Sequence, residues 1–265
     1  MVNITGTKEW AEKTFNVSSG CANNCRYCYA KCMAVRFNRK TRDNWSEEII
    51  DLSQATQLSR RKRTTSIMFP STHDITPKTL DTSLSAIKMV LNAEAGHRLL
   101  IVSKPRLKCI GRLCEELQSY RARILFRFTM GSANNDTLKF WEPGAPTFEE
   151  RLESLKLAFL AGYQTSVSSE PMLDDNIDAV IEQVVPFVTD AIWLGKINRL
   201  RTILSINGEN DVAITRAANE LIQIQSDENI KMLYESLKDN PSIKWKESIK
   251  TVVGLERPAQ AGLDI

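Results

Sequence analysis

This sequence has few histidines, little net charge and no long apolar segment. Its only histidines are His73 and His97, so the chain cannot form a metal centre of three or four histidines. The formal net charge of +3 is too small to indicate a general attraction to nucleic acid. No apolar run approaches the roughly 18 residues of a membrane helix, and the polar first residues lack the apolar core of a secretory signal. We therefore expect a cytoplasmic protein without a membrane segment.

The rest of the composition is that of an ordinary globular protein. Of the 265 residues, 42% are hydrophobic and 25% are charged, which is enough to form a core without covalent staples. The chain has six cysteines. Without a secretory signal, these indicate free thiols, a metal centre or catalysis, and not a disulfide framework.

Segments of strand pattern and helix pattern alternate before residue 200. The predicted strands cover residues 14–20, 64–71, 98–104, 122–132, 164–173 and 190–198. The predicted helices cover residues 26–37, 79–96, 106–120, 147–162 and 176–188. This alternation predicts an α/β fold with a parallel sheet covered by helices. Six such repeats favour a partial (β/α)6 TIM-type barrel, and a doubly wound open sheet is the competing topology.

Polar residues follow each predicted strand directly. After the cysteine-rich stretch that follows the first strand, these are STHD (71–74), SKP (103–105), TMGS (129–132), SSEP (168–171) and GKIN (195–198). In parallel barrels and sheets, ligands bind at the carboxyl ends of the strands. We therefore expect the candidate site at this end of the sheet.

The sequence changes character at about residue 207. The segment that follows is polar and mostly of helical pattern, and no low-complexity linker precedes it. We therefore divide the chain into a barrel of residues 1–206 and a mostly helical C-terminal extension of residues 207–265 that packs on it.

The stretch GCANNCRYCYAK (20–31) places Cys21, Cys25 and Cys28 in a C-x3-C-x2-C pattern. Thiolates bind soft metals, and both zinc and iron–sulfur sites normally use four protein ligands. Cys32 follows on a predicted helix and is better explained by packing. Three thiolates can hold an iron–sulfur cluster with one iron open to another ligand, whereas zinc would need a fourth ligand that the sequence does not identify.

This cysteine pattern, with Tyr27 before its last cysteine, resembles that of the radical S-adenosylmethionine superfamily. The segments 103–105 and 142–173 are similar to those of the subgroup related to spore photoproduct lyases. The resemblance implies a partial (β/α)6 barrel, a [4Fe–4S] cluster on the three cysteines, and S-adenosylmethionine on its fourth iron. It also implies a 5′-deoxyadenosyl radical that abstracts a hydrogen atom from a substrate, and an electron donor such as a flavodoxin or ferredoxin.

The resemblance also assigns roles to individual residues. The three cysteines of the pattern would ligate the cluster. Further contacts would come from Tyr27 against the adenine, Lys104 at the methionine carboxylate, Ser132 at the ribose or carboxylate, and Glu170 at the cofactor or substrate. The competing explanations are a core position for Tyr27, a solvated loop for Lys104, a turn for Ser132 and a salt bridge for Glu170.

The stretch STHD would contact the methionine amino group, according to the same resemblance. Ser71 and Thr72 are cofactor-binding candidates, and His73 and Asp74 join Glu170 as catalytic candidates, although a lone histidine is more often structural. Ser71 falls where spore photoproduct lyases carry a hydrogen-donating cysteine. Because a serine hydroxyl is a poor hydrogen-atom donor, this departure argues against thymine-dimer repair.

The sequence leaves the substrate open. Four consecutive cations, Arg60 to Arg63, precede the second predicted strand, and clustered cations can bind phosphates. They lie at the amino end of that strand, away from the expected site, so we interpret them as a solvated basic face. We expect a radical enzyme acting on a nucleobase, nucleotide or nucleic acid. The alternatives are a peptide or small-metabolite substrate, and a non-catalytic iron–sulfur or zinc protein, which would not need the polar strand ends.

Overall fold

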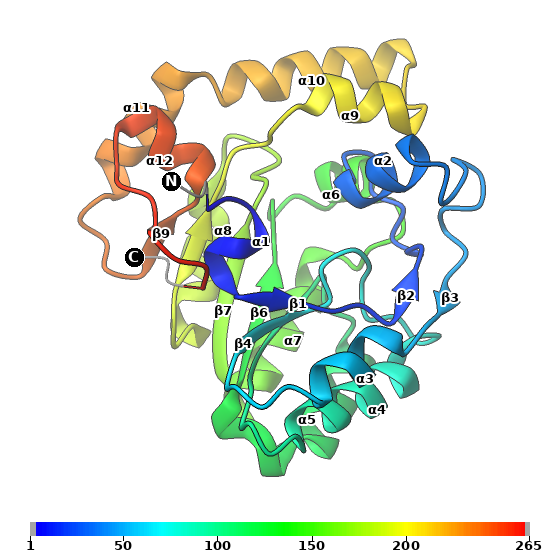
Figure 1. Ribbon diagram of the computed structural model, residues 1–265. Coiled ribbons are helices and arrows are strands. Elements are labelled where there is room, and N and C mark those ends of the chain that lie inside the picture. Colours follow the sequence, from blue (N-terminus) through cyan, green and yellow to red (C-terminus); the bar gives the residue numbers. More distant parts are fainter. Residues whose placement is uncertain (1–3, 263–265) are drawn as a thin grey trace.

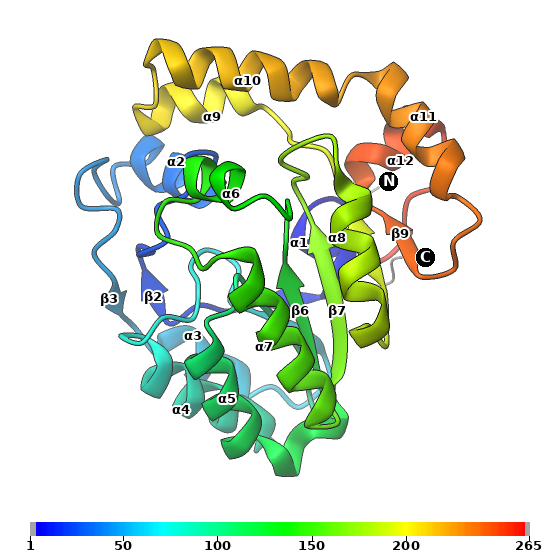
Figure 2. The same ribbon diagram turned by 180° about the vertical axis from the view of Figure 1, so that it is seen from behind.

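Seven parallel strands form the central sheet of the computed structural model, which describes residues 4–262 (Figures 1 and 2). In spatial order they are β1 (Lys13–Thr14), β4 (Ser66–Phe69), β5 (Arg98–Ser103), β6 (Ile124–Thr129), β7 (Gln164–Ser169), β8 (Ile192–Leu194) and β9 (Ile243–Trp245). Every neighbouring pair is parallel. The predicted α/β fold with a partial barrel is confirmed.

Helices cover the outside of the sheet and the carboxyl ends of its strands. They are α1 (Thr7–Trp10), α2 (Tyr29–Arg36), α3 (Ser53–Ser59), α4 (Leu80–Leu91), α5 (Leu107–Glu116), α6 (Asn135–Trp141), α7 (Phe148–Leu160), α8 (Ile177–Val184), α9 (Leu200–Asn207), α10 (Val212–Ile224), α11 (Asp227–Leu237) and α12 (Glu247–Val253). Short 3-10 helices are η1 (Gln118–Arg123) and η2 (Val185–Phe187), and β2 (Ser18–Ser19) pairs with β3 (Ile49–Ile50) in a small antiparallel sheet. Figures 1 and 2 show α9 and α10 crossing above the strand ends. No helix within residues 4–262 combines the length and apolarity needed to cross a membrane.

Strands β5 and β6 are largely apolar on both faces because the sheet is covered on both, whereas the buried β7 is mostly polar. In the register of β5 and β6, Leu100 lies opposite Leu125 and Ile101 opposite Phe126. Phe126 and Ile101 are fully buried in the core between the sheet and the outer helices. Burial on both faces is the reason why these strands appear in the sequence as near-continuous apolar runs.

Some element boundaries differ from those expected. The predicted first strand (14–20) is divided into β1 and β2, and the predicted helix 79–96 already ends at Leu91. Gly96 instead adopts φ 65° in the turn before β5. Thr147 caps α7, since its side chain accepts a hydrogen bond from the Glu150 amide. The Glu150 carboxylate accepts from the Leu107 amide at 3.1 Å and so ties α7 to α5.

The C-terminal extension is mostly helical, as expected, but it also supplies a strand that the sequence analysis did not predict. Strand β9 pairs with β8 and becomes the seventh strand of the sheet. The proposed boundary between residues 206 and 207 falls inside α9, and the outer limits 1 and 265 lie outside the described residues. The extension therefore continues the barrel wall.

The N-terminal segment lies across the open side of the barrel, between its two edge strands. The buried ammonium of Lys246, which follows β9, is 2.8 Å from a carboxylate oxygen of Glu9 and donates to the Gly6 carbonyl at 3.2 Å. The Glu247 amide donates to the other Glu9 oxygen at 2.9 Å. On the opposite edge, the Glu12 amide donates to the Ser66 carbonyl at 3.1 Å. Residues 6–12 thus bridge β9 and β4.

Candidate active site

A cavity of ≈ 590 Å³ opens at the carboxyl ends of the strands. The predicted site residues that line it are Cys21, Cys25, Tyr27, Cys28, Ser71, Thr72, His73, Asp74, Lys104 and Glu170. Further lining comes from Thr5–Thr7 of the N-terminal segment, from Lys196–Arg199 after β8, and from Ile203 of α9. The strand-end motifs therefore meet at one place, as the topology requires.

The three cysteines of the C-x3-C-x2-C pattern have the chemistry of a metal-binding loop. All three thiols are free, and burial raises their pKa values, to about 12 for Cys21. Within residues 4–262, no three potential ligand side chains are grouped closely enough to hold a single metal ion. A buried thiol becomes a thiolate when a cationic ligand compensates its charge. Two buried thiols and the partly buried thiol of Cys28 on one cavity wall therefore fit a group with several metal atoms.

Residues distant in sequence hold the cysteine loop in place. The Asn207 side-chain amide, at the end of α9, donates to the carbonyls of Arg26 at 2.9 Å and Cys28 at 3.1 Å. The Arg26 guanidinium is 2.5 Å from Glu209, and the Arg26 amide donates to the Trp141 carbonyl at 2.9 Å. Helices α9 and α6 thus fix the loop from outside, which leaves the cavity side of the thiols open to a ligand.

Asp74 connects three parts of the site through its two carboxylate oxygens. One oxygen accepts from the Asn23 side chain of the cysteine loop at 2.7 Å and from the Lys104 amide at 2.9 Å. The other accepts from the Ser103 hydroxyl at 2.5 Å and from the Ile75 amide at 2.7 Å. With four donors already bound, Asp74 is placed to position the loop and the end of β5. This arrangement favours a positioning role for Asp74 over the predicted catalytic role.

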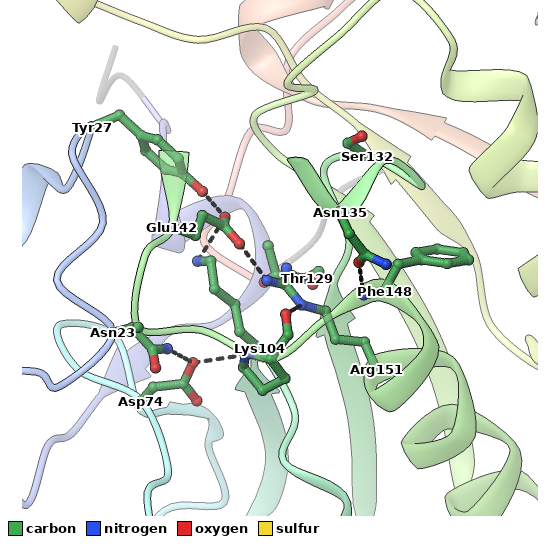
Figure 3. A network of polar contacts seen from close by, with 12 residues as sticks. Asn23, Tyr27, Asp74, Lys104, Thr129, Ser132, Asn135, Glu142, Phe148 and Arg151 are labelled. Atoms are coloured by element: carbon green, nitrogen blue, oxygen red, sulfur yellow. Dashed lines mark hydrogen bonds and ion pairs between the residues drawn. The ribbon is translucent and has the colours of Figure 1, made fainter. Parts of the chain in front are cut away.

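Lys104 belongs to a buried network around Glu142 (Figure 3). The Glu142 carboxylate accepts hydrogen bonds from the Tyr27 hydroxyl and, at 2.5 Å, from Arg151, and its distance to the Lys104 ammonium is 3.6 Å. Burial opposes ionisation of Glu142, but Arg151 and Lys104 overcome this effect and hold its pKa below the usual value. Burial likewise disfavours the Lys104 ammonium, but nearby negative charge, including that of Glu142, raises its pKa above normal. Lys104 is therefore a fixed positive charge on the cavity.

His73 uses both ring nitrogens in contacts with the backbone. Its Nε2 accepts from the Val17 amide at 3.0 Å, and its Nδ1 is 2.8 Å from the carbonyl of Asp74. These contacts fit a neutral ring with the proton on Nδ1, and burial lowers the pKa of His73 accordingly. The geometry favours the structural explanation of His73 over the predicted catalytic role.

Ser71 and Thr72 are held at the cavity by Asn16. The Asn16 side-chain oxygen accepts from the amides of Ser71 at 2.8 Å and Thr72 at 2.9 Å, and its nitrogen donates to the Ser71 hydroxyl at 3.1 Å. Tyr29, half-exposed beside them, donates its hydroxyl proton to the Ser71 carbonyl at 2.7 Å. The segment after β4 therefore presents a fixed polar edge to the cavity.

Ser132 is the one predicted site residue that does not line the cavity. It is fully buried, contacts the Asp174 carboxylate through its hydroxyl, and accepts from the Asn134 amide at 2.8 Å. The chain is closely packed beside it, because a Cβ at Gly131 would lie 2.6 Å from the Pro171 carbonyl oxygen. In Figure 3 the Ser132 side chain lies apart from Lys104. This geometry favours the turn explanation of Ser132, and the cofactor contact stays a prediction.

Glu170 lines the cavity at the end of β7, and its carboxylate is 3.5 Å from the Lys246 ammonium. Lys246 is almost fully buried and also binds Glu9. Glu170 therefore has the predicted salt bridge and a partly exposed carboxylate in the cavity.

The sequence analysis missed four residues on which the site depends. They are Asn23, Glu142, Arg151 and Lys246. Glu142 and Arg151 both lie in the segment 142–173 that supported the resemblance, which was a usable signal. Lys246 lies in the extension, for which no strand was predicted, so its position had no signal in the sequence.

A family model described as the radical SAM superfamily matches residues 15–185, the part of the chain that carries this cavity. The chain belongs to the radical SAM superfamily. It is a radical SAM enzyme, and the family implies a [4Fe–4S] cluster and S-adenosylmethionine as cofactors. The chain is also 21% identical over 182 residues to the uncharacterized protein MJ0683 of Methanocaldococcus jannaschii. The aligned region covers 67% of this chain and 67% of MJ0683.

Solved structures with the same fold include spore photoproduct lyases. A cysteine-to-serine mutant superposes with a TM-score of 0.57 and 17% identity, covering 92% of this chain and 79% of that chain. A double mutant with bound AdoMet and dinucleoside spore photoproduct gives a TM-score of 0.54 and 17% identity, covering 88% of this chain and 75% of that one. SuiB of Streptococcus suis, bound to its precursor peptide SuiA, gives a TM-score of 0.51 and 13% identity, covering 93% of this chain but only 51% of SuiB. The resemblance to the lyase fold is confirmed, and the identities are too low to indicate a shared substrate.

Proposed function

We propose that Cys21, Cys25 and Cys28 hold a [4Fe–4S] cluster and that S-adenosylmethionine binds beside it in the ≈ 590 Å³ cavity. When bound, the cluster would supply the electron that cleaves the sulfonium to give a 5′-deoxyadenosyl radical. The observation that carries this proposal is the convergence of three free thiols and a fixed ammonium, that of Lys104, on one cavity. Cysteine thiolates match the metal atoms of a cluster, and a lysine ammonium matches an anionic carboxylate.

In this proposal the protein residues bind and orient the cofactor. Lys104 would pair with the methionine carboxylate. The Glu142 carboxylate lies 3.6 Å from the Lys104 ammonium, a distance that leaves room for a second anion beside the ammonium. The fixed edge of Ser71 and Thr72 would face the methionine amino group. Tyr27 would stay protonated, since burial raises its pKa, and would present its ring to the adenine. Helix α9, which lines the cavity through Ile203, would limit access of water to the radical.

We propose a nucleobase, nucleotide or nucleic acid as the substrate. Two observations support this class: structures of the lyase fold contain a dinucleoside ligand, and the cavity is lined by Lys196, which pairs with Asp227, by Asn198 and Arg199, and by the carboxylate of Glu170. These groups can bind the polar edge and the phosphate of a nucleotide. None of the residues lining the cavity offers a thiol besides the three cysteines, so return of a hydrogen atom by a cysteine, as expected for thymine-dimer repair, is not part of the proposal. A peptide remains the alternative class.

The proposed reaction needs a reductant of low potential, of the flavodoxin or ferredoxin class. The proposed setting is the cytoplasm, whose reducing conditions keep the thiols of a chain without disulfides free.

The test is anaerobic reconstitution with iron and sulfide, reduction with dithionite, and chromatographic measurement of 5′-deoxyadenosine. We expect a brown protein with about four irons per chain that forms 5′-deoxyadenosine. Cys25→Ala should lose both iron and product. Cys32→Ala is the matched control, because Cys32 is a free, buried thiol on α2 that does not line the cavity. Equal iron in both variants would contradict the assignment of the ligands.

The substrate class is tested by transfer of deuterium into 5′-deoxyadenosine. Deuterated nucleosides and oligonucleotides should label the product, whereas deuterated peptides should not. Labelling by peptides alone would overturn the nucleotide proposal and leave the cofactor assignment intact.

A further inference from the structure

Cations gather at the amino ends of the strands, at the end of the barrel opposite the candidate active site. Arg60–Arg63 precede β4, Arg98 begins β5, and Arg121 and Arg123 lie in η1 directly before β6. All except the half-buried Arg123 are exposed. We call these residues the basic rim. In Figure 1 the strands β6 and β7 point away from this end and toward α9 and α10.

Hydrogen bonds hold the segments of the basic rim side by side. The Thr64 hydroxyl donates to the Ala95 carbonyl at 2.5 Å, and the Arg98 amide donates to the Thr65 carbonyl at 3.2 Å. The Arg123 guanidinium donates to the Leu91 carbonyl at 2.9 Å. The turns before β4, β5 and β6 therefore form one continuous surface.

The basic rim is not neutralised by acidic side chains. In the described part of the chain, no salt bridge involves Arg60–Arg63, Arg98 or Arg121. Cations on the outer helices differ, since Lys156 lies 2.7 Å from Glu153. The whole chain has a net charge of only +3, so the rim is more positive than the chain as a whole.

A second cavity of ≈ 330 Å³ lies within this surface. It is lined by Arg98 and Arg123 of the basic rim and by Lys244 of β9, with Arg127 deeper inside. Arg127 is paired with Asp190 at 2.9 Å, and Glu9 is the other carboxylate among the described residues of the wall. Within residues 4–262, cations therefore exceed carboxylates on this wall, and an anionic group can enter between the guanidinium groups of the rim.

We propose that the basic rim binds the phosphate backbone of a nucleic acid strand, with one phosphate in the ≈ 330 Å³ cavity. The extent of the rim favours a polymer, because its cations reach well beyond the single cavity and each can contact a separate phosphate. A membrane surface is less favoured, since residues 60–65, 95–98 and 118–123 include none of the exposed large apolar side chains that membrane insertion uses.

This inference goes beyond the proposed function. The basic rim contains no cavity residue of the candidate active site, so it adds an attachment point that is independent of the cofactor. A strand held there would be retained on the enzyme while another part of it reaches the opposite end of the barrel.

The test is fluorescence anisotropy with a labelled single-stranded oligonucleotide of about 20 nucleotides, titrated with the reconstituted protein between about 50 and 200 mM salt. The variant is Arg60→Ala/Lys62→Ala/Arg63→Ala, which removes exposed cations without a salt-bridge partner. We expect its affinity to fall at least about tenfold at the lower salt. The slope of log K against log salt should decrease in magnitude by about 2, from about 0.7 for each lost phosphate contact.

The matched control is Lys156→Ala/Arg216→Ala/Lys238→Ala, which removes the same charge from α7, α10 and the end of α11. It should bind like the wild type, and circular dichroism should show that both variants fold. An equal loss in both variants would reduce the effect to net charge and overturn the proposal. Binding of a mononucleotide as tightly as of the oligonucleotide, or binding to anionic vesicles instead, would overturn it as well.

The outcome can be separated from that of the proposed function. Cys25→Ala should bind the oligonucleotide like the wild type, because Cys25 lies at the other cavity. The rim variant should still form 5′-deoxyadenosine without added substrate.

Discussion

Replacement of Arg151 by methionine should destabilise the protein far more than replacement of any exposed cation on the same helix. The Arg151 side chain is completely buried and donates to the Pro146 carbonyl at 3.0 Å, the Thr129 carbonyl at 3.1 Å and Glu142 at 2.5 Å. Without it, the buried Glu142 carboxylate keeps only Tyr27 and the more distant Lys104. Removing one partner of a buried ion pair costs about 3–5 kcal/mol. For a chain of this size, that lowers Tm by on the order of 10 °C.

Urea unfolding followed by circular dichroism measures this cost, for the metal-free and the reconstituted protein. Lys156→Met is the control, because Lys156 pairs with Glu153 on the surface of the same helix, and we expect it to cost less than about 1 kcal/mol. The double variant Arg151→Met/Glu142→Gln should recover part of the loss, since it no longer buries an unpaired charge. Equal costs for the two single variants, or a double variant as unstable as the sum of its single changes, would refute the reasoning.

Three further predictions concern the cysteine loop and the seam, by which we mean the contact of Glu9 with Lys246 and Glu247 between the N-terminal segment and the end of β9. Burial raises the pKa of Glu9 from 4.5 to about 7. The contribution of this carboxyl group to folding stability is therefore complete below its unfolded pKa and is lost as the pH rises toward 7. Glu9→Gln should flatten this loss of stability, measured as urea midpoints between pH 5 and 7.5. Gly144→Ala would place a Cβ 2.3 Å from the Ala22 carbonyl oxygen and should lower the iron bound per chain, whereas Gly111→Ala, with only a 3.8 Å contact, should not. Asn207→Ala removes two hydrogen bonds to the loop and should cost about 1–3 kcal/mol in unfolding experiments and speed iron loss to a chelator.

The architecture could be predicted because the periodicity of apolar residues and the order of strand and helix segments can be read from the sequence. Strands buried on both faces leave apolar runs, and their alternation with helices leaves few topologies. The same rule located most of the site, since parallel strands bring Cys21, Ser71, Lys104 and Glu170 to one end. It did not place Ser132 on the cavity wall, because the rule gives the end of the strand but not the direction in which the side chain points.

The polar partners within the site could not be predicted in the same way. Glu142 and Arg151 are nine positions apart across a turn, and their contact depends on how α7 packs against the end of β6. Lys246 follows a strand of three residues, which is too short for its period to be distinguished from the helices around it. Local pattern therefore identifies the residues on the strands, whereas tertiary packing selects the charges that hold them.

The seam between the N-terminal segment and β9 has a consequence for biosynthesis. Lys246 emerges from the ribosome about 220 residues after the cysteine loop, and it is the residue that joins Glu9 to Glu170. At translation rates of about 5–20 residues per second, roughly 10–45 s pass between synthesis of the three cysteines and synthesis of Lys246. During this interval the barrel wall of the nascent chain is incomplete. Iron delivered during this interval would meet an unshielded loop, so maturation of the metal centre is expected to follow release of the finished chain.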